Sequence, residues 1–138
     1  MAVLARAGAE AIAARLRRAE AIPEWRRLRG PDTGLVMLRG RSGGGGASFN
    51  LGEMTVTRCT LRLASGLVGH ATVAGRNLRH AELAALADAL LQDPARQDAL
   101  LADLIAPLAA AQQVQRQALA ARAAATRVQF FALQTMRT

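Results

Sequence analysis

The sequence predicts an α+β fold in which a small antiparallel sheet, including a hairpin, packs with N-terminal and C-terminal helices. Two observations carry this prediction. Residues 54–63 and 67–73 alternate in polarity and are joined by Ala64-Ser65-Gly66, as in a β-hairpin. Segments near both ends instead repeat their apolar residues at helical spacing. At 138 residues the chain suits one core, so we expect a single domain over residues 1–138.

The N-terminal part reads as a helix followed by strands. Apolar residues at helical spacing predict an amphipathic helix over residues 2–20, and Pro23 ends that region. We expect a first strand at 25–29, a turn at 30–34, and a second strand at 35–39. In the second of these strands Leu35 and Met37 lie on one face and Val36 and Leu38 on the other, and apolar residues on both faces indicate an interior strand.

A glycine run divides these strands from the hairpin. Residues 43–46 are all glycine, which is costly inside a strand or helix, so 42–48 is predicted to be a mobile loop. Glycines also let backbone N–H groups approach a phosphate. A Walker-type loop needs a following Lys, but Ala47 and Ser48 follow and the chain has no lysine. A plain linker is therefore the favoured interpretation.

In the hairpin, Thr57, Cys59, Leu61 and Leu63 share one face of the first strand. The return strand is followed by Asn77, which is predicted to cap a helix that runs to about Gln92.

Helices are also predicted for the C-terminal third. Asp93-Pro94 starts a short helix, and Pro107 opens a last helix through about Ala125. Residues 128–133 are apolar and either extend that helix or form a strand. They contain Phe130 and Phe131, which an isolated terminus would leave in water. Because the apolar content is mostly Ala and Leu, the core is thin, and we expect both chain ends to contact other proteins.

The charge is +8, and every one of the basic residues is arginine. The choice of Arg over Lys is explained by genomic base composition, or by contacts with phosphates and carboxylates. One function class consistent with this charge is a small basic nucleic-acid-binding protein. The arginines are scattered, however, and stacking aromatics are scarce, which argues against it.

The residues whose side chains could take part in catalysis or metal binding do not form a complete site. Cys59 is the only cysteine, so no disulfide and no thiol metal site is expected, and a small buried side chain is the favoured interpretation. His80 and Glu82 lie two apart on a helix and do not converge on a metal. Glu53 and Arg58 form an ion pair or meet a neighbour. We therefore expect no catalytic residue and no metal, and a stand-alone nucleotide-binding enzyme is disfavoured.

No segment reads as a secretory signal or a membrane span. A cytoplasmic location is the resulting expectation.

The chain resembles the G subunit of the carbon–phosphorus lyase system, the PhnG family. The resemblance covers residues 33–133 through an ordered series of motifs: TGLV at 33–36, FNLGE at 49–53, TVTR at 55–58, GHA at 69–71, VAGRN at 73–77, HAE at 80–82, ALADAL at 85–90, LIAPL at 104–108 and RVQFF at 127–131. No single motif is specific, but their order and spacing are.

This resemblance implies a non-catalytic subunit of a core complex with PhnH, PhnI and PhnJ, with PhnK and PhnL associated. It implies no membrane or nucleic-acid partner. In that family the complex uses a phosphonate to displace adenine from MgATP, forming ribose 1-methylphosphonate 5-triphosphate. MgATP is then the substrate of the complex, and no cofactor is expected on this chain alone.

Residues within or beside these motifs are the candidates for contact with substrate or with other subunits. The candidates for either contact are Gly44, Gly45, Asn50, Glu53, Arg58, Arg76, His80 and Glu82. Phe130 and Phe131 are the candidate interface residues.

Overall fold

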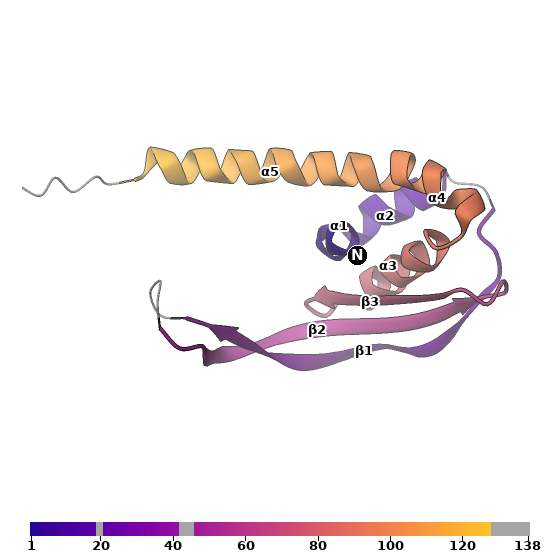
Figure 1. The fold of residues 1–138 in the computed structure, drawn as a ribbon, viewed down its shortest axis with the longest axis horizontal. Coiled ribbons are helices and arrows are strands. Elements are labelled where there is room, and N and C mark those ends of the chain that lie inside the picture. The colour runs from indigo at the N-terminus through magenta and orange to yellow at the C-terminus, as the bar shows by residue number, and fades with distance from the viewer. Residues whose placement is uncertain (19–20, 42–45, 128–138) are drawn as a thin grey trace, which may run out of the picture.

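The computed structural model describes residues 1–18, 21–41 and 46–127. The elements in chain order are α1 (Ala2–Arg6), α2 (Ala9–Leu16), β1 (Trp25–Gly40), β2 (Phe49–Leu63), β3 (Val68–Ala74), α3 (Leu78–Leu90), α4 (Pro94–Leu100), the π-helical turn η1 (Leu101–Ile105) and α5 (Ala106–Ala125). The described strands form one antiparallel sheet in the order β1-β2-β3, and the helices lie on one side of it (Figure 1). The α+β prediction is confirmed.

The predicted hairpin is present as β2 and β3. The expected inward face of β2 is buried at Thr57, Cys59, Leu61 and Leu63, with Leu61 completely so. On β3, Gly69 lies so close to α3 that a Cβ atom there would sit 2.0 Å from the Ala85 carbonyl oxygen. The absence of a side chain at this position is what lets α3 rest directly on the sheet.

Helix α3 is the centre of the core. Asn77 caps it as predicted, its Oδ1 accepting a hydrogen bond of 2.9 Å from the backbone N–H of His80. Helix α3 packs between the sheet and the N-terminal helices and is buried on several sides. Its small residues Ala81, Ala84 and Ala85 are all fully buried.

Strand β1 differs from the prediction in two ways. The chain runs as one strand through the expected turn, because irregularities in pairing near Arg27, Arg29 and Asp32 absorb the residues around Gly30-Pro31. An edge position also tolerates a proline, which has no N–H to donate. The expected interior strand at 35–39 is likewise wrong: β1 is at the edge of the described sheet, and Leu35 is 58% exposed.

The N-terminal helix also departs from the prediction. It is broken after Arg6, where Ala7 and Gly8 adopt extended backbone before α2 begins. Leu4 and Ile12 are completely buried. The N-terminal helices therefore contribute to the chain's own core, and contact of this end with other proteins stays a prediction. The last helix, in contrast, begins within one residue of the predicted start and ends at the predicted Ala125.

Candidate functional site

The far end of the β1–β2 ribbon extends beyond the helices that cover the rest of the sheet. We call residues 33–40 with 49–55 the ribbon arm. At its base the Thr33 and Thr57 hydroxyls are 3.2 Å apart, and the Thr57 hydroxyl donates to the Gly75 carbonyl at 2.7 Å. Farther out, Leu35 and Met37 pair with Thr55 and Glu53, which places them on the face that the helices cover elsewhere. Because nothing among the described residues covers them there, their side chains stay exposed.

The far end of α5 is a second projecting element, which we call the helix arm (residues 113–125). Leu108 is the buried residue of α5, and the Gln112 side chain still donates a hydrogen bond of 2.8 Å to the Val3 carbonyl. From residue 113 to 125 every side chain is exposed, including Val114 at 65% and Leu119 at 68%. The helix arm therefore has no buried face within the described chain.

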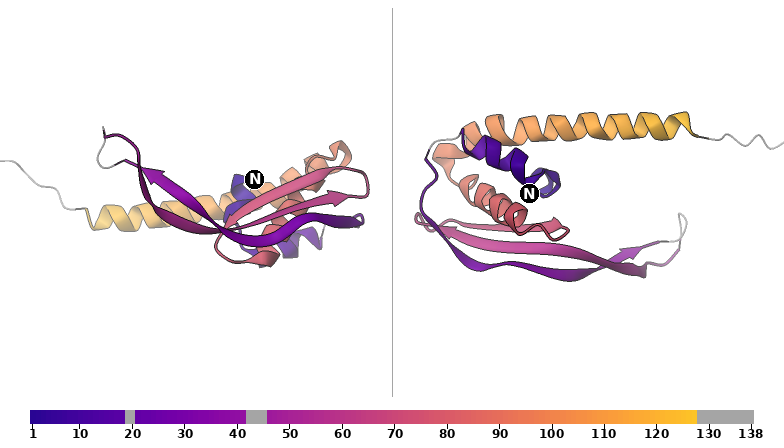
Figure 2. Two further views of the ribbon diagram at one scale, coloured as in Figure 1. Left: turned by 90° about the horizontal axis from the view of Figure 1, so that it is seen from below. Right: turned by 180° about the vertical axis from the view of Figure 1, so that it is seen from behind.

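Both arms extend past the packed part of the molecule in the same direction (Figures 1 and 2). That packed part, the body, comprises α1–α4 with β3 and the covered lengths of β1 and β2. Exposed large apolar residues gather on the arms, namely Leu35, Met37, Leu38, Phe49, Leu51, Met54, Val114 and Leu119. Clustered apolar exposure of this kind marks surfaces that bind other proteins.

The predicted site residues of the ribbon do not form one site. Gly44 and Gly45 lie outside the described residues. Asn50 and Glu53 are exposed on the ribbon arm, where Asn50 pairs with Arg39. Arg58 points to the opposite face of β2 from Glu53, because side chains alternate along a strand. The suggested Glu53–Arg58 ion pair is therefore absent from the structure.

The predicted residues around α3 have separate structural roles. His80 is only 8% exposed, and its Nε2 lies 2.8 Å from the Leu4 carbonyl oxygen, which ties α3 to α1. Glu82 instead pairs with Arg27 of β1, and the hydrogen bond between them raises the pKa of the Arg27 guanidinium. Arg76 is exposed in the connection between β3 and α3. The three residues do not converge on a common point.

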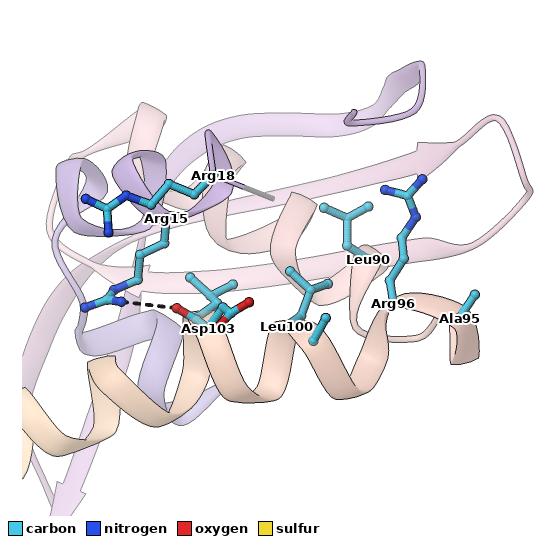
Figure 3. Close-up of a pocket in the computed structure, with 9 residues that line it drawn as sticks. Arg15, Arg18, Leu90, Ala95, Arg96, Leu100 and Asp103 are labelled. Carbon is cyan, nitrogen blue, oxygen red and sulfur yellow. Dashed lines mark hydrogen bonds between the residues drawn. The ribbon is translucent and has the colours of Figure 1, made fainter. Parts of the chain in front are cut away.

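Sequence reasoning missed a pocket between α2, α3 and α4 (Figure 3). Its volume is about 210 Å³, with Leu90, Leu100 and Leu104 among its apolar lining. Arg15 lies at its side and donates a hydrogen bond of 3.1 Å to the Asp103 carbonyl, and Arg96 donates one of 3.0 Å to the Ala21 carbonyl. Residues distant in the sequence build this pocket, so no local motif signals it.

The described residues include no cluster of three metal-ligating side chains that could hold a metal ion. Burial raises the pKa of the Cys59 thiol, and Cys59 is only 2% exposed. A buried thiol with a raised pKa is a poor nucleophile, which supports the interpretation of Cys59 as a core residue. Across the same described residues, no helix has the length and apolar character that crossing a membrane requires.

Comparison with known proteins identifies the family. The family model described as "Phosphonate metabolism protein PhnG" matches residues 1–137. A relative from Rhizobium meliloti (strain 1021), named alpha-D-ribose 1-methylphosphonate 5-triphosphate synthase subunit PhnG, is 48% identical over 111 residues, which cover 80% of this chain and 70% of the relative. The family-model match, over residues 1–137, covers the helices, the hairpin and both arms. The chain therefore belongs to the PhnG family of phosphonate metabolism proteins.

Proposed function

We propose that this chain is a non-catalytic subunit of the carbon–phosphorus lyase core complex. In this role it supports the phosphonate-dependent displacement of adenine from MgATP, which forms ribose 1-methylphosphonate 5-triphosphate. The observation that carries the proposal is the family match over residues 1–137, together with the synthase-subunit name of the relative.

The geometry supports a role in assembly. The candidate residues that could take part in chemistry lie apart. His80 contacts the Leu4 carbonyl and Glu82 pairs with Arg27 on the helix side of the sheet, while Asn50 and Glu53 lie on the ribbon arm. The two arms, in contrast, expose apolar side chains that a single chain leaves in water. Covering them with another protein would recover roughly 25 cal/mol per Å² of apolar surface, before the costs of association.

The proposed partners are PhnH, PhnI and PhnJ, with PhnK and PhnL associated, in the cytoplasm. MgATP is proposed to be the substrate of the assembled complex, and this chain alone is proposed to bind no cofactor. Phe130 and Phe131 lie outside the described residues and stay predicted interface residues. Nucleic-acid binding, the alternative from the sequence, is not favoured by the family assignment.

The test compares the chain alone with the assembled complex. Purified chain, the other core proteins, and the mixture of both are each incubated with MgATP and methylphosphonate, and adenine release is followed by chromatography. We expect release from the mixture only. Adenine released by the chain alone, above a heat-killed control, would overturn the non-catalytic assignment. Full activity of the other proteins without this chain would overturn its role as a subunit.

A further inference from the structure

The face of the sheet turned away from the helices is strongly basic. Side chains at alternate positions of β2 and their pairing partners on β1 place four arginines on this face, together with the carboxylate of Asp32. Glu24, just before β1, lines a hollow with Arg26 and Arg62 at one end of the face. We call the surface formed by Arg26, Arg29, Arg58 and Arg62 the basic face. No helix of the described chain covers it (Figures 1 and 2).

The arrangement of charges on the basic face opposes folding. Arg26 pairs directly with Arg62 across the two strands, and like charges at such positions destabilise a sheet. The Asp32 carboxylate is 3.9 Å from Arg29 Nε, and the exposed fractions of the Arg29 and Asp32 side chains are 73% and 47%. Such a pair contributes little. Local conflicts of this kind are typical of functional surfaces, because the missing counter-charge comes from a bound partner.

Other arginines of the chain do find carboxylates on the helix side. Arg27 pairs with Glu82, Arg79 with Glu10, and Arg96 with Asp93 at 3.4 Å. Among the described residues, three of the four ion pairs therefore lie on the helix side, and the basic face has only the Arg29–Asp32 pair. Its four arginines exceed the two carboxylates nearby, those of Asp32 and Glu24.

The chemistry of the basic face suits carboxylates. Arg29, Arg58, Thr60, His70 and Thr72 line a shallow hollow of about 180 Å³, in which the Thr60 hydroxyl lies 3.1 Å from His70 Nδ1. Guanidinium groups hold carboxylates through two parallel hydrogen bonds. The hollow is small, but the charge continues along β2 to Arg62, about 13 Å farther at about 3.3 Å per residue.

The extent of the basic face favours a protein segment as its occupant. Several carboxylates spaced along a chain could meet Arg58 and Arg62 together, whereas one bound phosphate would leave most of the charge unanswered. Nucleic acid would benefit from aromatic stacking. The only tryptophan, Trp25, pairs with Leu63 on the helix side, and the Arg27 guanidinium lies 5.9 Å from its ring centre.

We propose that the basic face docks an Asp- and Glu-rich segment of another subunit of the complex. This inference rests on the proposed function, and it adds the surface and the charge of the partner. The apolar arms and the basic face then serve different contacts, since they present different chemistry.

The absence of lysine from the chain allows a sharp test. The single variants Arg58→Lys and Arg62→Lys each add one side-chain amine to the basic face. Arg17→Lys, exposed after α2 on the helix side, is the matched control. Each variant is co-expressed with the other core proteins, and the purified complex is treated with a carbodiimide, which joins amines only to carboxylates in contact. Mass spectrometry should find positions 58 and 62, but not 17, joined to Asp or Glu of another subunit.

A second measurement follows the rate of association. The double variant Arg58→Glu with Arg62→Glu should bind the other core proteins about 10-fold more slowly at low salt, and the difference should shrink as salt screens the charges. Arg17→Glu should leave the rate unchanged. Circular dichroism and thermal melting of the isolated variants establish that they remain folded.

The outcomes separate the two proposals. If the wild-type chain does not co-purify with the other core proteins, the proposed function fails. If the complex forms but positions 58 and 62 join to no other subunit, or only to a second copy of this chain, the docking inference is wrong. RNA that co-purifies with the wild type and is lost from the charge-reversed variant, or phosphate binding that the variant abolishes while assembly is unchanged, would also overturn it.

Discussion

The body and the two arms of this chain use similar residues to opposite effect. In the body, Leu61 is completely buried and Leu90 is 2% exposed. On the arms, Leu51 is 61% exposed and Leu119 is 68% exposed. The same side chain therefore stabilises this chain in one region and is available to another protein in the other. The position of a leucine in the fold, and not the number of leucines, therefore decides whether it stabilises the core or stays exposed.

Neither arm has the support that such elements need in isolation. Two-stranded ribbons and helices of about 12–15 residues are each marginal in water without packing. The helix arm compensates partly through its alanines, which favour helix more than any other residue. Four predictions test the contrast between body and arms, beginning with the largest expected effect.

Substitution of Gly69 by Ala should damage the body most. The added Cβ would fall 2.0 Å from the Ala85 carbonyl oxygen, so α3 must move away from the sheet. We expect a loss of roughly 3 kcal/mol or more of stability, measured by urea unfolding. Gly34→Ala is the control, because its Cβ would meet only the Arg58 side chain, at 3.5 Å. Equal stability of the two variants would show that α3 does not rest on β3 as described.

Truncating a leucine in a helix of the body should lower the stability far more than truncating one in the helix arm. Leu90→Ala removes a buried side chain and should cost about 2–5 kcal/mol. Leu119→Ala removes one that is 68% exposed and should change the stability by no more than about 0.5 kcal/mol. Chemical denaturation of both variants measures the difference. A large loss at Leu119 in the isolated chain would mean that the helix arm packs on this chain after all.

Loss of the α3 cap should have an intermediate effect. Asn77→Ala removes the acceptor of the 2.9 Å hydrogen bond from the His80 N–H and should cost about 1 kcal/mol. Asn77→Asp keeps an acceptor and should retain most of the stability. Thermal melting of the three proteins gives the order, and an Ala variant as stable as the wild type would contradict the capping role.

The ribbon arm should tolerate change in the isolated chain. Leu35→Ser with Met37→Ser alters side chains that are 58% and 51% exposed, so the melting temperature should hardly change. Recovery of the other core proteins in a pull-down should nevertheless fall, because the apolar contact is lost. A double variant that binds as well as the wild type would remove the ribbon arm from the interface.

Local signals predicted much of the body. The hairpin followed from strict alternation and a short connection, and Asn77 and Pro107 marked the starts of helices to within a residue. The strands predicted at 25–29 and 35–39 are both part of β1, but the turn predicted between them is wrong, because Gly30-Pro31 is a turn signal on its own. Only pairing with β2, which no local pattern reveals, makes it part of a strand. The strand predicted at 35–39 lies at the edge rather than in the interior, since apolar side chains alone do not distinguish a buried strand from an exposed one.

The candidate sites show the same limit. Asn50 and Glu53 lie exposed on the ribbon arm and stay predicted contact residues. The basic face could not be predicted, because it depends on the register that sets Arg26 against Arg62. The pocket beside Arg15 likewise requires the packing of three helices. A surface or pocket that tertiary contacts build from distant residues cannot be recognised from short sequence motifs.

The π-helical turn η1 has a consequence for the direction in which the helix arm faces. Leu100, Leu104 and Leu108 are all buried at intervals of four residues. In a regular α-helix each such step would overshoot a full turn by about 40°. The wider turn at Leu101–Ile105 winds more slowly and offsets this drift, much as an inserted residue would. Deleting one residue there would rotate all of α5 that follows by about 100° about its axis. The direction in which each side chain of the helix arm points is thus set by the length of a five-residue segment next to the body, as well as by its position in the arm.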